Sequence, residues 1–204
     1  MKNILILIIT IISITATAQT AKEADMVKLV NQVRTNPKSF IPLVEKYLKD
    51  KEEFINKPFI VDLPDGFTVT KRSKTITNDE YIITLRNEVK DLIDYLNTVK
   101  PVKALATSEK LYRTSKMQVE YLKSIKKLTH DGPNGESASK RFSHGVILCG
   151  ENCATGQTAI YALLALLIDS GNNPKGHRIN IFLEKFTKIG VGNENEYWVQ
   201  DFGY

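Results

Sequence analysis

One stretch of the chain, Thr158 to Ile168, limits the possible folds more than any other. Its residues are apolar on nearly every side, which is typical of a helix buried in a core rather than one lying at the surface. Eleven residues are too few to cross a bilayer, which takes about 20. We therefore expect a core helix that ends near Gly171, because glycine favours helix termination.

Four other segments have apolar residues at helical spacing. They are 26–33, 40–48, 85–96 and a helix that opens at Ser108. The buried side of the last one should carry Leu111, Ser115, Val119 and Leu122.

Strand patterns occur in two places. Residues 59–70 are rich in β-branched and aromatic residues around Pro64-Asp65-Gly66, which predicts a β-hairpin. Residues 188–202 alternate in polarity around an Asn-Glu-Asn turn, which predicts two more strands. We expect 129–156, rich in Gly, Ser and Asn, to be mostly loop with one short strand.

The N-terminus has the pattern of a secretory leader. Lys2 precedes the apolar run Ile4 to Ile14, and Ala16-Thr17-Ala18 supplies the small residues of a cleavage site. Cleavage after residue 18 leaves 186 of the 204 residues and, with the loss of Lys2, lowers the net charge from +5 to +4. We expect a single domain over 19–204 in the periplasm or outside the cell.

The charges do not favour a nucleic-acid partner. Basic residues (28 Lys and Arg) only slightly outnumber acidic ones (23 Asp and Glu), and the two kinds alternate along the chain. No apolar segment is long enough for a membrane span. We expect a monomer.

Two of the three histidines lie beside glycine and acidic residues. His130 occurs in Thr-His-Asp-Gly, Glu151 in Gly-Glu-Asn, and His177 in Gly-His-Arg-Ile-Asn, while Asp169 closes the apolar helix. Imidazoles and carboxylates are ligands of Zn²⁺, and a glutamate beside them can act as a general base. By spacing alone the signal has little specificity, because His130 and His177 are 47 residues apart.

The order of the motifs is more informative. Val-Asn-Gln-Val-Arg at 30–34 is followed by the motifs at 129–132, 150–152 and 176–180, and then by Tyr-Trp-Val-Gln-Asp-Phe at 197–202. This succession resembles the bacterial branch of the CAP superfamily, the SCP-like domains related to cysteine-rich secretory proteins, antigen 5 and pathogenesis-related proteins. The resemblance covers 107–204 and 25–36, and about 50–106 looks like an insertion peculiar to a subgroup.

The resemblance implies an α+β fold: a three-layer α-β-α sandwich with a central, mainly antiparallel sheet, plus a hairpin-and-helix insertion. It also implies a cleft in which His130 and His177 bind Zn²⁺ or another divalent metal, lined by Glu151 and Asp169. Asp169 stands where the family has a second Glu, and its side chain is one methylene shorter, so it reaches the cleft through a water or not at all.

For function, the resemblance implies a binding module for a lipid, peptide or protein ligand. The alternative is a metal-dependent hydrolase, a peptidase or esterase, with Glu151 as general base. Two His ligands are fewer than the three protein ligands usual for catalytic zinc, which favours binding. A purely structural or adhesion role is the third possibility.

Two cysteines bracket the Gly-Glu-Asn motif. In an exported protein, Cys149 and Cys153 are predicted to form a disulfide that ties the loop carrying Glu151. This spacing requires a sharp turn of the backbone. Two free buried thiols, or a soft-metal site with His144, are the alternatives.

Overall fold

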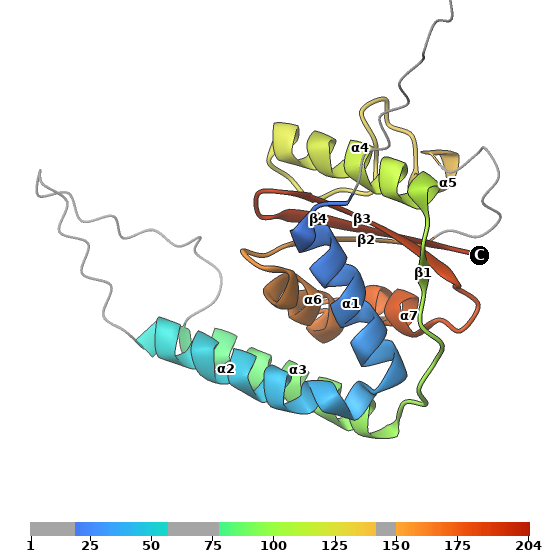
Figure 1. The fold of residues 1–204 in the computed structure, drawn as a ribbon. Helices are drawn as coiled ribbons and strands as arrows, with labels where there is room; N and C mark the ends of the chain where they lie inside the picture. Colours follow the sequence, from blue (N-terminus) through green and yellow to red (C-terminus); the bar gives the residue numbers. More distant parts are fainter. Residues whose placement is uncertain (1–18, 57–77, 142–149) are drawn as a thin grey trace, which may run out of the picture.

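The computed structural model describes residues 19–56, 78–141 and 150–204 (Figure 1). The predicted leader, the hairpin at 59–70, Cys149 and His144 lie outside these ranges. The elements are α1 (Ala21–Thr35), a 3₁₀ turn (Pro37–Phe40), α2 (Ile41–Asn56), α3 (Asn78–Thr98), β1 (Ala106–Thr107), α4 (Glu109–Ile125), α5 (Ala138–Arg141), β2 (Gly150–Thr155), α6 (Ala159–Ile168), α7 (Gly176–Phe182), β3 (Lys188–Glu194) and β4 (Tyr197–Gly203).

The sheet has the strand order β1-β3-β4-β2. β4 pairs antiparallel with both β3 and β2, and β1 adds a short parallel edge to β3. The sheet is thus mainly antiparallel, as predicted. The turn between β3 and β4 is shorter than predicted, because Asn193 and Glu194 still pair with Trp198 and Tyr197. Asn195 adopts φ 55° there, a conformation that asparagine tolerates better than most residues.

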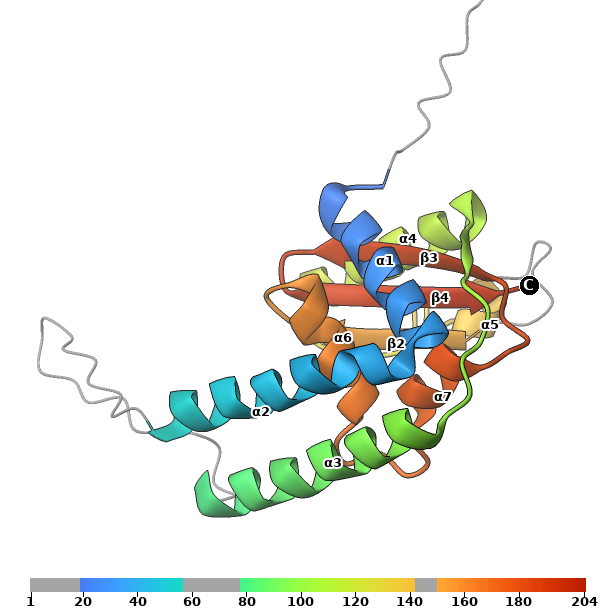
Figure 2. The same ribbon diagram turned by 60° about the horizontal axis from the view of Figure 1, so that its bottom comes forward.

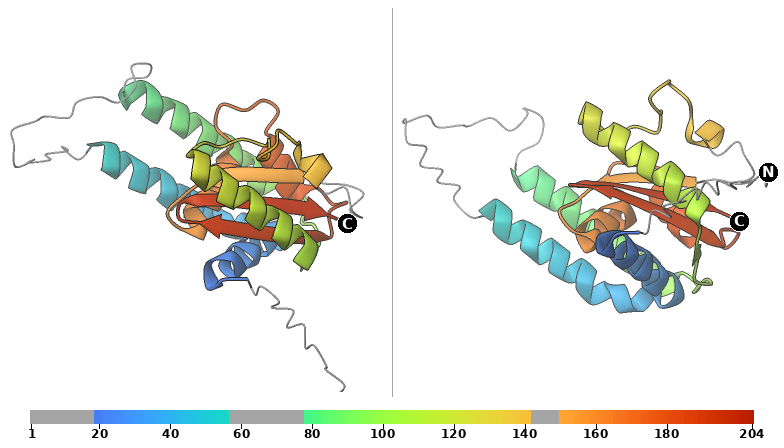
Figure 3. Two further views of the ribbon diagram at one scale, coloured as in Figure 1. Left: turned by 90° about the horizontal axis from the view of Figure 1, so that it is seen from above. Right: turned by 45° about the horizontal axis from the view of Figure 1, so that its top comes forward.

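Helices cover both faces of the sheet. α4 lies on one face, and α1, α6 and α7 lie on the other (Figure 1; Figure 3, right). α2 and α3 run side by side beneath the second helical layer (Figure 2). The predicted α-β-α sandwich is confirmed, with α2 and α3 packed outside it.

α6 is the predicted core helix. Thr158 caps its N-terminus by accepting a hydrogen bond from the backbone N–H of Tyr161. The helix ends at Ile168, where the apolar run ends: Asp169, at φ 52°, is the left-handed cap, and Gly171, at φ 78°, follows two residues later. Among the described helices, none combines the length and apolarity needed to cross a membrane.

The other helical predictions in the described ranges are also confirmed. α1 buries Met26, Val30 and Val33 completely. Ser108 is the N-cap of α4, and the four residues expected on the buried side of α4 are all buried: Leu111, Ser115, Val119 and Leu122.

Arg34, at the end of α1, is buried, and none of the carboxylates that the structure describes pairs with it. Its guanidinium instead donates to the carbonyls of Lys103 at 2.9 Å, Ile181 at 2.5 Å and Phe186 at 3.3 Å. Burial lowers the pKa of Arg34 to about 10. These bonds join α1 to the segment before β1, to α7 and to the segment between α7 and β3.

Glycines let α4 approach the sheet closely. A Cβ atom at Gly190 would lie 2.1 Å from the carbonyl carbon of Leu111 and 2.2 Å from the backbone nitrogen of Tyr112. At Gly176, by contrast, a Cβ would meet nothing within 4 Å.

We predict that Gly190→Ala destabilises the fold by about 2–3 kcal/mol. The added Cβ would meet backbone atoms of α4, so α4 and β3 would have to move apart. Gly176→Ala is the control and should change the free energy of unfolding by less than about 1 kcal/mol. Urea denaturation of both variants measures the difference. Equal stabilities would contradict the close packing of α4 on β3.

Candidate functional site

The predicted histidines meet at the edge of the sheet formed by β2. His130 belongs to the segment between α4 and α5, and His177 lies in the first turn of α7, on the other face of the sheet. Their ring centroids are 6.3 Å apart. A cavity of about 320 Å³ lies here, lined by His130, Glu151, Asn172, Asn173, Pro174, Gly176, His177 and Asn180.

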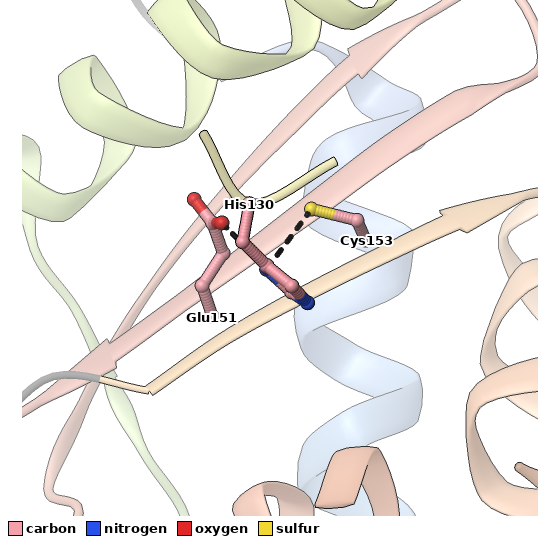
Figure 4. A group of neighbouring side chains, drawn as sticks. All are labelled: His130, Glu151 and Cys153. Carbon is pink, nitrogen blue, oxygen red and sulfur yellow. Dashed lines mark hydrogen bonds and ion pairs between the residues drawn. The ribbon is translucent and has the colours of Figure 1, made fainter. Parts of the chain in front are cut away.

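His130 is held by a buried carboxylate. Its Nδ1 lies 2.8 Å from Oε1 of Glu151, which projects from β2 on the same side as Cys153 (Figure 4). The other oxygen of Glu151 accepts a hydrogen bond from Arg141. The Glu151 side chain is 2% exposed, whereas that of His130 is 56% exposed. The carboxylate is therefore inside the fold and the imidazole faces the cavity.

His177 is held in the same way by Asp169. Oδ1 of Asp169 lies 2.8 Å from Nδ1 of His177, and Oδ2 accepts a 2.9 Å hydrogen bond from the His177 backbone N–H. Asp169 is buried behind His177 and does not line the cavity. The aspartate side chain, although shorter than a glutamate, contacts the His177 imidazole directly. It can do so because Asp169 is the C-cap of α6, where the chain turns back toward α7.

Each imidazole thus presents its Nδ1 to a carboxylate. Neither Nε2 has a hydrogen-bond partner among the residues that the structure describes. A carboxylate on one ring nitrogen fixes the tautomer and leaves the lone pair of the other nitrogen for a metal. This is the arrangement expected of a pair of metal-binding histidines.

Cys153 provides a second possible donor set. Its Sγ lies 3.8 Å from Nδ1 of His130 (Figure 4), and ligand atoms of His130, Glu151 and Cys153 all fall within 4.8 Å of one another. Burial raises the pKa of the Cys153 thiol far above its usual value, and the negative charges of Glu151 and Asp201 add to this. Because the thiolate is the form that binds metals, this set is the less favourable one.

The predicted disulfide involves Cys149, which lies outside the described residues. The pairing of Cys149 with Cys153, and its alternative with His144, stay predictions.

Two residues behind Glu151 were not expected at the site from the sequence. Asp201 is the cross-strand neighbour of Glu151 and is fully buried. Burial, followed by the charge of Glu151, raises the pKa of Asp201, while Thr114 donates a 2.7 Å hydrogen bond to it. Arg141 is the other, and its pairing with a residue ten positions further along the chain follows no periodicity that a sequence pattern could reveal.

Asn152 points to the opposite side of β2 from Glu151. It donates to the backbone carbonyl of His177 at 3.2 Å and to Oε1 of Gln200 at 3.1 Å, and it accepts a 2.9 Å hydrogen bond from Asn180. Asn152 and Asn180 thus attach the edge strand to α7. Neither acts by holding the Glu151 side chain.

A larger cavity of about 480 Å³ lies at the end of α2, between α2 and α6. Two of its charged lining residues, Asp50 and Lys51, already have partners within the fold. Asp50 accepts hydrogen bonds from the Tyr161 hydroxyl at 2.6 Å and from Lys46 at 2.8 Å, and Lys51 lies over the ring of Tyr47. The cleft at β2 is therefore the stronger candidate site.

The profile of the cysteine-rich secretory protein family, CAP, matches residues 27–202. The chain therefore belongs to this family, and the match encloses the segment 50–106. No protein with a curated description matches the chain.

The chain is also similar to parts of three solved structures. An extracellular protein of Bacillus anthracis containing an SCP domain is 24% identical (TM-score 0.45), and the match covers 64% of this chain but 45% of that one. An outer surface protein of Borrelia burgdorferi is 22% identical (TM-score 0.43; 63% and 95% covered). A cysteine-rich secretory protein of Staphylococcus aureus is 15% identical (TM-score 0.41; 58% and 38% covered).

The hydrogen bond to Glu151 is the main cause of a raised pKa at His130, while burial acts in the opposite direction. We predict that an NMR pH titration gives His130 a pKa above 6.5, which falls in Glu151→Gln. The protonated pair stabilises the fold fully below pH 6.5, and this contribution is lost as the pH rises through the folded-state pKa. Asp131→Asn is the control and should lower the pKa less, since Asp131 is a minor cause. An unchanged pKa in Glu151→Gln would contradict the contact.

Proposed function

We propose that the protein is an exported binding module whose cleft holds a divalent metal ion on His130 and His177. The supporting observation is that both imidazoles direct Nδ1 to a buried carboxylate, at 2.8 Å in each case. Export is supported by the leader pattern at 1–18 and by membership in a family of secretory proteins.

The donor set suits zinc. With Zn–N bonds of about 2.0–2.1 Å in tetrahedral geometry, two imidazole centroids lie ~5 Å apart. The observed 6.3 Å requires a small closing movement, and the exposed ring of His130 has room for it. Copper is also compatible with imidazole ligands.

Two protein ligands leave coordination positions open. A bound divalent ion would supply positive charge and attract a carbonyl, carboxylate or phosphate group of an incoming ligand. Asn172 and Asn173 line the same cavity and contribute amide groups to its polar wall. This combination supports recognition of a polar or anionic group on a lipid headgroup, peptide or protein partner.

The surroundings of Glu151 support binding over hydrolysis. A general base must reach the proton that it removes, but Glu151 is buried, and its two oxygens face His130 and Arg141. We expect no chelator-sensitive turnover of peptides or esters. Turnover that is lost in Glu151→Gln would instead favour the metal-dependent hydrolase.

Calorimetric titration of residues 19–204 with Zn²⁺ tests the proposal. We expect micromolar or tighter binding that weakens at least about 100-fold in His130→Ala and in His177→Ala, because each removes a ligand. His144→Ala is the matched control and should keep the wild-type affinity. No binding to the wild-type protein, or loss only in the control, would overturn the assignment.

Co²⁺ spectroscopy separates the two donor sets. We expect no thiolate-to-metal charge-transfer band, and we expect Cys153→Ala to retain its affinity. A band that disappears in Cys153→Ala, with affinity retained in His177→Ala, would place the metal on His130, Glu151 and Cys153.

A further inference from the structure

One face of α3 is turned toward the start of α7, which carries His177. Glu88, Asp91 and Tyr95 follow one another at spacings of three and four residues, which places them on the same side of the helix. Glu88 pairs with Lys175, and Asp91 accepts a 2.7 Å hydrogen bond from Arg178. The ring of Tyr95 lies 5.1 Å from the Arg178 guanidinium carbon.

Lys175 and Arg178 also hold the end of α6. Arg178 donates to the carbonyl of Leu167 at 2.7 Å and to that of Ile168 at 3.2 Å, and Lys175 donates to the carbonyl of Asp169 at 3.1 Å. Cations that bond the last carbonyls of a helix stabilise its C-terminus. These two side chains therefore join α6, α7 and α3.

Both cations depend on α3 for charge compensation. The Arg178 side chain is 5% exposed, and a buried cation left without a partner is strongly unfavourable. Lys175 and Glu88 are each mostly buried in their pair. Within the described residues, only α3 supplies carboxylates to these two cations.

The end of α6, which these contacts hold in place, supports His177. Asp169 adopts a left-handed conformation that costs free energy in residues other than glycine, so the surrounding contacts must impose it. The same residue holds both Nδ1 and the backbone N–H of His177. The orientation of the imidazole thus follows from the position of Asp169.

We infer that Glu88 and Asp91 are positioning residues, through which α3 sets the orientation and tautomer of His177. α3 belongs to the segment 50–106, so this segment acts on the cleft by supporting one of its two histidines. His130 provides an internal reference, because the Glu151 carboxylate that binds it is held by Arg141 of α5 and not by α3. The effect on metal binding rests on the proposed function, but the effect on the imidazole does not.

The test is the variant Glu88→Gln/Asp91→Asn, compared with Asp94→Asn. Asp94 lies on the same helix, is exposed and pairs with Lys90 one turn away, so its replacement removes the same kind of charge without touching the start of α7. Imidazole ¹⁵N chemical shifts report the tautomer of each histidine. In the wild-type protein and in Asp94→Asn we expect His177 to carry its proton on Nδ1.

In the double variant we expect a mixed tautomer at His177, an unchanged signal from His130, and Zn²⁺ affinity lowered about 3–10-fold, by analogy with the loss of outer-shell partners. The single variant Asp91→Glu keeps the charge, so its His177 imidazole ¹⁵N shifts should stay close to those of the wild-type protein. If the double variant does not fold, Asp91→Asn alone carries the test, because Asp91 is 55% exposed and its loss is better tolerated.

An unchanged His177 signal in a folded variant overturns the inference and leaves α3 with a role in stability alone. A shifted His177 signal in a protein that binds no Zn²⁺ supports the inference and contradicts only the proposed metal site.

Discussion

The alternation of side chains along the edge strand β2 is the constraint on which the cleft depends. Successive residues of a strand point to opposite faces, so Glu151 faces the α4 side and Asn152 faces α7. Glu151 can therefore hold His130 from one layer of helices, while Asn152 binds the backbone of His177 from the other. Because β2 is an edge strand, nothing in the sheet separates the two imidazoles, and they meet beside it.

The two halves of the cleft differ in how firmly they are held. His177 is fixed through Asp169 by contacts that involve three helices, and its side chain is 23% exposed. His130 lies in the polar segment after α4, with a ring that is more than half exposed and one cation, Arg141, behind its carboxylate. The proposed metal site would have one preorganised ligand and one that can adjust, which would suit the reversible binding of partners better than a rigid catalytic centre.

Much of this arrangement follows from patterns in the chain. Helical periodicity predicts α1, α4 and α6 because each must bury one face or, for α6, nearly its whole surface. The order of the motifs picks out His130, Glu151 and His177, which line one cavity, and Asp169, which lies behind it. The apolar run Thr158 to Ile168 matches the extent of α6, and Asp169, which closes the helix, takes the left-handed conformation while its carboxylate binds His177.

Hydrophobic period and motif order are local properties of the chain, and they predict most of the helices, the last two strands and the residues that meet in the cleft, but not β1, α5 or α7. Which atoms face one another depends on the packing of the sheet and the helices. No pattern in the chain shows that Arg141 pairs with Glu151, that Asp201 lies behind Glu151, or that Glu88 and Asp91 pair with Lys175 and Arg178. Such pairs join residues up to 87 positions apart, and their contacts arise only when the sheet and the layers of helices pack together.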